Sequence, residues 1–197
     1  LWVTKGQKED ADIAGYTVVD LPTVLATHIT EIIRTHAHEF LGRQEGHTLI
    51  ENFRRTHPKV VDELIPNEMT LGAVVKVLQN LLKEQVSVRD LLTVFETLAD
   101  ESPNTKDLDA LTESVRKSLA RTISRKYTND EGVIPVMSLS PQYEEVVSSS
   151  LLQSENGVQL VMDPVQANSM INEMARMIDN HPEFAGQPIL LTSPTIR

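Results

Sequence analysis

The sequence predicts an α+β protein of several subdomains, mainly α-helical, in which a helical bundle precedes a small, incomplete α/β subdomain. Two observations support this fold class. Through residues 43–126, apolar residues recur at the three- and four-residue spacing of amphipathic helices. After Tyr127, an apolar run followed by Ser or Asp and then proline occurs three times, which is typical of a strand leading into a capped helix. The chain is therefore divided into residues 1–42, 43–126 and 127–197.

Residues 1–42 are expected to contain a short strand and a long helix. The strand is predicted at residues 16–20, which are β-branched and aromatic. Asp20 and Pro22 mark the helix start, because an Asp side chain caps free N–H groups and proline fits the first helical turn. Apolar residues then recur at helical spacing until Gly42, which is expected to end the helix.

Five helices are expected in residues 43–126, each bounded by a capping residue or a proline. They are predicted at Thr48–Thr56, from Pro58 to Pro66, after a Thr70 cap, between a Ser87 cap and Pro103, and over residues 107–125. Together they form a compact helical bundle.

The α/β region is expected to begin after a turn and to lack its end. Its strands are predicted at Val133–Leu139, Val158–Met162 and Ile189–Thr192, before the pairs Ser140-Pro141, Asp163-Pro164 and Ser193-Pro194. Only Thr195, Ile196 and Arg197 follow the third pair, too few to form a stable turn. The subdomain is therefore expected to be truncated at its C-terminus.

Composition excludes several classes of function. A net charge of −10 disfavours nucleic acid and anionic lipid as partners. The absence of cysteine rules out disulfides and thiolate metal sites. No apolar run approaches the roughly 20 residues that span a bilayer. The opening residues have neither an initiator Met nor a signal-peptide pattern, so the sequence is expected to be a piece of a longer chain.

No residue pattern predicts catalysis, a metal or a cofactor. His28, His36 and His38 lie close in sequence, but His38 is about 160° around the helix from the apolar stripe that holds His36. We therefore expect a hydrogen-bonded core His36 and a solvated His38. The adjacent acidic pairs point about 100° apart, so they make no acid/base dyad. These pairs are Asp62-Glu63, Asp100-Glu101 and Glu144-Glu145. A hydrolase or metalloenzyme using His36 or His38 is the alternative of a different class, and stoichiometric bound zinc would reveal it.

Two further side-chain groups have both a structural and a functional interpretation. A basic patch comprises Arg116, Lys117, Arg121, Arg125 and Lys126. Its cations complement a helix dipole, or they make a salt-sensitive contact with an acidic neighbouring subunit. The methionines Met170, Met174 and Met177 share one helical face, which favours core packing over an adaptable binding stripe.

Several stretches resemble the FHIPEP family of flagellar type III export gate proteins. They are Ala14–Asp20 running into Val24–His28, Leu41–Glu45, Lys76–Leu82 with Val88–Leu91, and Thr105–Asp107 with Leu111–Glu113. The α/β region resembles the family only weakly, through Pro188–Leu191 and Ser193-Pro194. The resemblance covers residues 14 to about 126.

The resemblance implies a non-enzymatic docking platform in the cytoplasmic domain of a bacterial inner-membrane protein. The implied partners are flagellar export chaperones, their substrates and other export apparatus proteins, and the intact protein would form a nonameric ring. Residues 1–42 would then be remnants of the first two cytoplasmic subdomains, followed by a helical third and a truncated fourth. An export gate of a virulence injectisome is the alternative within the same broad family.

The resemblance also implies a chaperone-binding site between the first two subdomains, at Val19, Val24 and Thr27. Helical geometry agrees in part, because Thr27 lies nearly opposite the apolar stripe around Ile29 and Val24 lies at its edge. An exposed helix threonine without a binding role is the alternative at Thr27. The upstream acidic and aromatic residues that complete the family's site are absent from this sequence.

Overall fold

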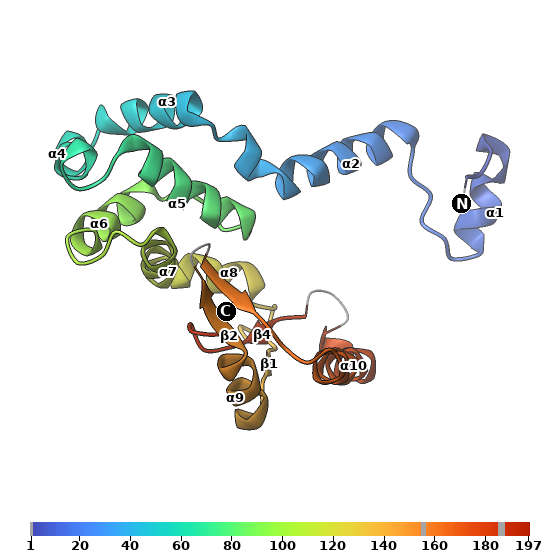
Figure 1. Cartoon of the computed structure of the whole chain (residues 1–197). Helices are drawn as coiled ribbons and strands as arrows, with labels where there is room; N and C mark the ends of the chain where they lie inside the picture. Colours follow the sequence, from blue (N-terminus) through green and yellow to red (C-terminus); the bar gives the residue numbers. More distant parts are fainter. Residues whose placement is uncertain (1, 155–156, 185–187) are drawn as a thin grey trace. The chain divides into compact units, whose positions relative to one another are not determined.

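The computed structural model describes residues 2–154, 157–184 and 188–197, and the fold class is confirmed as α+β and mainly helical (Figure 1). Contacts separate two units, residues 1–123 and 124–197. The helices that begin before the unit boundary are α1 (Lys8–Ile13), α2 (Leu21–Thr35), α3 (Arg43–Arg54), α4 (Pro58–Glu63), α5 (Leu71–Lys83), α6 (Leu91–Glu101), α7 (Leu108–Ser118) and α8 (Ala120–Tyr127), which crosses it. The short helical turns of this unit are η1 (Lys5–Gln7), η2 (Ala37–Phe40) and η3 (Leu64–Glu68).

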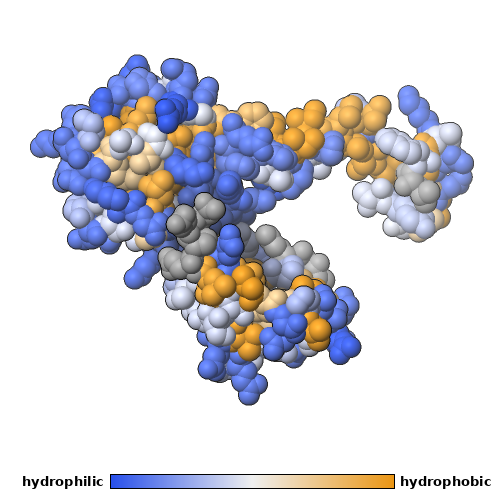
Figure 2. Space-filling view, in the orientation of Figure 1, coloured by the Kyte–Doolittle hydropathy of each residue, from blue (hydrophilic) through white to orange (hydrophobic). Residues whose placement is uncertain are grey.

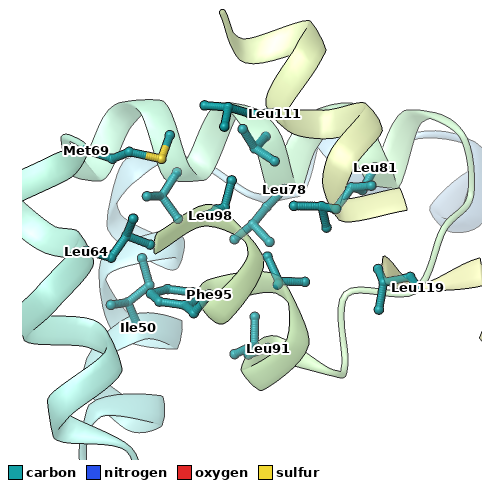
Figure 3. Packing of buried hydrophobic residues seen from close by; sticks show 14 of the residues in the cluster. Ile50, Leu64, Met69, Leu78, Leu81, Leu91, Phe95, Leu98, Leu111 and Leu119 are labelled. Atoms are coloured by element: carbon teal, nitrogen blue, oxygen red, sulfur yellow. The ribbon is translucent and has the colours of Figure 1, made fainter. Parts of the chain in front are cut away.

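The core of the first unit lies among α3 to α7 (Figure 3). Its largest side chain, Phe95 of α6, is fully buried and tilts against Phe53 of α3 with ring centroids 5.2 Å apart. Around it lie Ile50, Leu64, Leu78 and other aliphatic residues at or near zero exposure. The apolar face of each helix therefore closes over one common core, as the helical spacing predicts.

A glycine allows α3 and α5 to approach closely. Gly46 is buried in α3, and a methyl group at its position would overlap Cγ2 of Val75 in α5. Gly42 precedes the helix as its N-cap, so α3 begins at Arg43 and not at the predicted Thr48.

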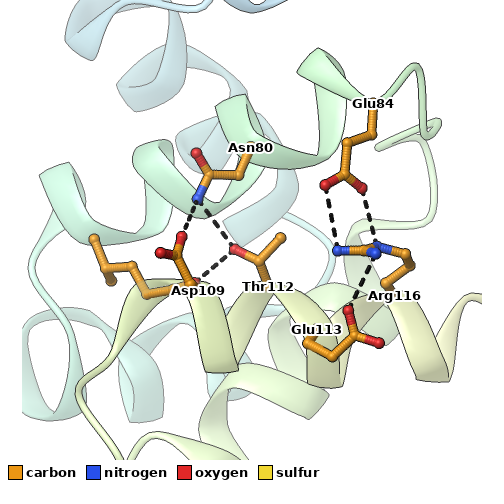
Figure 4. Close-up of polar contacts among 7 residues, drawn as sticks. Asn80, Glu84, Asp109, Thr112, Glu113 and Arg116 are labelled. Atoms are coloured by element: carbon orange, nitrogen blue, oxygen red, sulfur yellow. Dashed lines mark hydrogen bonds and ion pairs between the residues drawn. The ribbon is translucent and has the colours of Figure 1, made fainter. Parts of the chain in front are cut away.

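Polar contacts fasten α5 to α7 (Figure 4). Arg116 is largely buried, with a side chain 13% exposed, and its Nε lies 3.0 Å from Oε2 of Glu84. Its Nη1 lies 3.1 Å from Oε2 of Glu113. Nη2 donates a hydrogen bond to Oε1 of Glu84 at 3.3 Å, while the Nε and Nη1 contacts are ion pairs without hydrogen-bond alignment. Asn80 donates to Oγ1 of Thr112 at 3.3 Å, one turn away along the same interface.

Three further sequence predictions about the first unit are wrong. Residues 16–20 form no strand with any described residue, although the backbone of Asp20 is extended. The cap of α6 is Asp90 and not Ser87, because the Asp90 carboxylate accepts the N–H of Thr93. The helix predicted over 107–125 is interrupted at Leu119, which is buried and has φ −84° and ψ 6°.

The described residues of the second unit form two small sheets and two longer helices. Its elements are β1 (Met137–Ser138), α9 (Pro141–Ser149), β2 (Leu151–Ser154), β3 (Gly157–Leu160), α10 (Pro164–Asn180), η4 (Pro182–Phe184) and β4 (Leu190–Leu191). β1 pairs with β4 in parallel, and β2 pairs with β3 as an antiparallel hairpin.

The predicted caps of the second unit are confirmed, but its strands differ from the prediction. Ser140 and Asp163 cap α9 and α10. Only Met137–Ser138 of the strand predicted at 133–139 is paired, and β2 was not predicted. The third pair, Ser193-Pro194, leads into a single turn in which the N–H of Ile196 donates to the carbonyl of Ser193 at 3.3 Å, although no stable turn was expected there. The division into three regions stays a prediction, since contacts separate only two units.

Candidate functional site

The predicted binding residues lie around the start of α2. The Oδ1 atom of Asp20 accepts the backbone N–H of Thr23 at 3.0 Å, and Pro22 occupies the first turn. Hydrogen bonds from Thr23 hold the pKa of the Asp20 carboxyl below its ordinary value of 3.8. This cap sets the direction in which the chain leaves the extended segment and enters the helix.

The structure places all three predicted residues on the surface of the described chain. Val19 is 53% exposed in the extended segment just before the cap, and Val24 is 37% exposed in the first turns of α2. Thr27 is also exposed. Val24 and Thr27 are three residues apart, so they lie about 60° apart on adjacent turns of one helix face. The three side chains thus come from one short, cap-fixed stretch of backbone.

The apolar stripe of α2 is also exposed, which the helical spacing did not predict. Leu25, Ile29 and Ile33 are 52%, 55% and 51% exposed, and no residue of α2 is buried. Figure 2 shows this apolar surface along the helix labelled α2 in Figure 1. Because every face of α2 is open, the exposure of Thr27 does not by itself separate a binding role from a plain surface position.

The histidine environments are the reverse of those predicted. His36 is exposed at the C-cap of α2, and its Nδ1 lies 2.8 Å from Oε1 of Glu39. This contact with His36 lowers the pKa of the Glu39 carboxyl. The His38 side chain is only 24% exposed, with a buried Nδ1 that has no hydrogen-bond partner. The prediction failed because the helix ends at Thr35, so the helical phase used to place both residues does not continue.

No group of three or more His, Asp or Glu residues within the described ranges could hold a metal ion. None of the described helices is long and apolar enough to cross a membrane. The expectations of no metal, no cofactor and no catalysis stay predictions.

Arg116, one of the five residues of the predicted basic patch, is not on the surface with the others. Arg116 faces inward onto Glu84 and Glu113, whereas Lys117, Arg121 and Arg125 are exposed. Sequence spacing could not separate these roles, because Arg116 and Lys117 are neighbours that point in different directions.

Other candidates have mostly structural roles. Met170 is buried in the second unit while Met177 is 39% exposed, so core packing explains only part of the methionine stripe. Of the acidic pairs, Glu144 accepts the N–H of Ser193 at 3.3 Å and Asp62 pairs with Arg54 at 3.2 Å.

One hydrogen bond between helices of the second unit was not predicted from the sequence. The Tyr143 hydroxyl donates to Oε2 of Glu173 at 2.7 Å, which links α9 to α10 and raises the pKa of Tyr143. No local sequence signal connects residues 30 apart in this way.

Comparison with known proteins identifies relatives along the whole chain. The FHIPEP family model matches residues 1–197. The flagellar biosynthesis protein FlhA of Bacillus subtilis is 40% identical over 196 residues, which cover 100% of this chain and 29% of that protein. FlhA of Escherichia coli is 34% identical over 197 residues, with 28% of that protein covered. The chain thus spans under a third of the length of these relatives.

Solved structures agree with this relationship. The CdsV and CdsO protein complex of Chlamydia pneumoniae gives a TM-score of 0.85 at 31% identity, covering 100% of this chain and 57% of the matched chain. The nonameric SctV-C of EPEC gives a TM-score of 0.84 at 29% identity, covering 98% of this chain and 58% of the matched chain. From the full-length family match and these similarities, we conclude that the chain belongs to the FHIPEP family.

Proposed function

We propose that this chain is part of the docking platform of a bacterial flagellar type III export gate, which binds complexes of export chaperones with their substrates and helps to order flagellar export. The observation that supports this most is full-length similarity to flagellar FlhA proteins at 32–40% identity. The platform is non-enzymatic in this proposal, and it belongs to the cytoplasmic domain of an inner-membrane protein.

The proposed chaperone site comprises Val19, Val24 and Thr27. Two exposed valines flank a helix cap, and apolar side chains exposed in this way offer contact area to a partner. Thr27 lies one turn beyond Val24, where a larger side chain would project into a bound partner. Residues outside this chain complete the site in the proposal, so the intact cytoplasmic domain is the proper test molecule.

The proposal includes assembly into a nonameric ring and contact with other export apparatus proteins. Support comes from the similar SctV-C, which is nonameric, and from CdsV, which was solved in a complex with CdsO. A virulence injectisome gate is the alternative, and it predicts binding of injectisome chaperones in place of flagellar ones.

The test is Thr27→Met in the intact cytoplasmic domain. Methionine on an exposed helix face should change the free energy of unfolding by no more than about 0.5 kcal/mol. In a complementary binding groove it would clash, and loss of one well-packed contact can cost about 2 kcal/mol, roughly thirtyfold in affinity. Calorimetric titration with a filament chaperone–substrate complex measures this loss.

The matched control is Thr35→Met, which makes the same change on the same helix about 12 Å further along its axis. Thermal melts of both variants report the fold. The site assignment fails if Thr27→Met binds as tightly as the control. It also fails if Thr27→Met melts well below the control, because Thr27 would then be structural.

A further inference from the structure

A histidine lies beside the proposed chaperone site on α2. His28 follows Val24 by four residues, so it lies about 40° around the helix from Val24 and one turn further along. Thr27 lies about 60° from Val24 in the other direction, so Thr27 and His28 flank Val24 on the next turn. His28 is exposed, as Val24 and Thr27 are. A partner that covers Val24 and Thr27 will therefore also contact His28.

The side chain of His28 is available to such a partner. It forms no hydrogen bond or ion pair with any other residue of the described ranges. Of the six histidines in the sequence, four have a polar contact with a nearby hydroxyl or carboxylate. These are His36, His38, His57 and His181. His47 in α3 is exposed like His28 and has no described partner either, but it belongs to another helix.

The nearest neighbours of His28 on the helix are mostly apolar. Side chains three or four positions apart on a helix lie next to one another. For His28 these neighbours include Val24, Leu25 and Ile32, all of which are exposed. His28 thus lies at the border between the proposed site and the exposed apolar stripe of α2. A partner that binds over this border will enclose the imidazole among apolar side chains.

The charged groups around His28 in the described chain are either paired or distant. Glu31, on the next turn, has its Oε2 atom 3.4 Å from Nη1 of Arg34. The charged groups of neighbouring elements lie at the two ends of α2, about 10 Å or more from His28 along the helix axis. They are Lys8 of α1, whose charge acts on Asp20, and His38 and Glu39 of η2. The partner surface will therefore determine which charge state of His28 is favoured in the complex.

We propose that His28 is a contact residue of the chaperone site and that docking requires its neutral form, so that docking weakens as the pH falls. The inference rests on the proposed docking function and adds a regulation of the same site. A histidine side chain changes its charge between pH 5 and 8. Removal from water among apolar groups disfavours the charged imidazolium, because its hydration is lost and no counter-charge replaces it.

The sign and size of the effect follow from this preference. Because the complex accepts the neutral imidazole, the full affinity is present at high pH and is lost as the side chain gains a proton. A solvated histidine is roughly nine-tenths neutral at pH 7.5 and roughly one-tenth neutral at pH 5.5. The affinity should therefore fall roughly tenfold between these two pH values, in proportion to the neutral fraction.

Calorimetric titration of the intact cytoplasmic domain with a filament chaperone–substrate complex tests this at pH 7.5 and 5.5. His28→Gln is neutral at both values, so its affinity should be nearly the same at both. His28→Lys is charged at both, so it should bind roughly tenfold more weakly than the original domain at pH 7.5, with little further loss at pH 5.5. His47→Gln, the matched control, should keep the tenfold ratio of the original domain.

The ratio of affinities at the two pH values is compared between variants, because acid also changes the charge of the chaperone and of the rest of the domain. Those changes are common to all four proteins. Thermal melts at both pH values report the fold of each variant. A side chain with a merely structural role would not change the ratio, so the ratio separates contact from structure.

Three results would overturn the inference while leaving the docking proposal intact. The first is an equal pH ratio for His28→Gln and the original domain. The second is a ratio that His47→Gln removes as completely as His28→Gln does. The third is docking that becomes tighter in acid in the original domain alone, because a carboxylate of the partner would then face His28. If the original domain binds no chaperone–substrate complex at pH 7.5, the docking proposal itself fails and this inference fails with it.

Discussion

Gly46→Ala tests the close approach of α3 to α5. The added methyl group would overlap Cγ2 of Val75, and it would also lie 3.6 Å from both Cβ and Cγ1 of that residue. Val75 is 3% exposed and β-branched, so it has little freedom to rotate away. The substitution must therefore separate α3 from α5 or strain the core.

Two opposing effects determine the size of the change. Alanine in a helix interior is favoured over glycine by about 1 kcal/mol. Overfilling a packed core costs typically about 1–3 kcal/mol, and a stiff, buried neighbour puts this site in the upper part of that range. We expect Gly46→Ala to lower the free energy of unfolding by about 1–2 kcal/mol.

Urea denaturation followed by far-UV circular dichroism measures this change. Gly72→Ala in α5 is the matched control, because its methyl group would make only ordinary contacts of 3.6–3.9 Å with the Arg43 side chain. That variant should be as stable as the original or more stable. The double variant Gly46→Ala with Val75→Ala should be more stable, by about 1 kcal/mol, than the sum of the two single-variant losses would give. If Gly46→Ala is as stable as Gly72→Ala, the helices are not packed as described.

Two further predictions concern polar contacts, one at Arg116 and one at Asp20. Arg116→Met should lower the free energy of unfolding by about 1–2 kcal/mol, which is less than for a fully buried ion pair because the carboxylate of Glu84 stays partly solvated. Lys117→Met, the control, should change the free energy of unfolding by about 0.5 kcal/mol or less. Urea denaturation measures both changes. The lowered pKa of Asp20 means that its carboxylate stabilises the start of α2 at pH values above its unfolded-state pKa near 3.8, and this stabilisation is lost as the pH falls through the lower folded-state pKa. Carboxyl NMR titration of Asp20 should therefore give a pKa below 3.8, and a value at or above 3.8 would contradict the cap.

Features of the fold that depend on neighbouring residues were predictable from the sequence. The caps at Asp20, Thr70 and Asp163 were predicted, and each side chain accepts a backbone N–H three residues later in the structure. A cap is a contact within one turn, so the sequence contains all the groups that form it. The helical spacing of the bundle was similarly informative, because each of its apolar faces meets another within the same unit.

Features that depend on distant contacts were not predictable. The helix predicted over 107–125 bends at Leu119, where burial of that side chain against the bundle outweighs continuous helix geometry. The ion pairs of Arg116 with Glu84 and Glu113 depend on how α5 meets α7, which no spacing rule describes. The hairpin strand β2 was missed because its apolar run is short and follows the end of α9 directly.

The candidate site contains both features that the sequence predicts and features that it does not. The residue types of Asp20 and Pro22 predicted the cap, and helical spacing predicted the apolar stripe and the position of Thr27 opposite it, all of which are properties of one helix. It did not predict that Leu25 and Ile29 would be exposed, because a stripe indicates which face prefers burial and not what covers it. An isolated helix of this length is marginally stable in water, and exposed apolar surface of this kind typically marks a contact with another segment or protein. The assignment of Val19, Val24 and Thr27 therefore rests on the family relationship, and the comparison of Thr27→Met with Thr35→Met gives it an independent physical test.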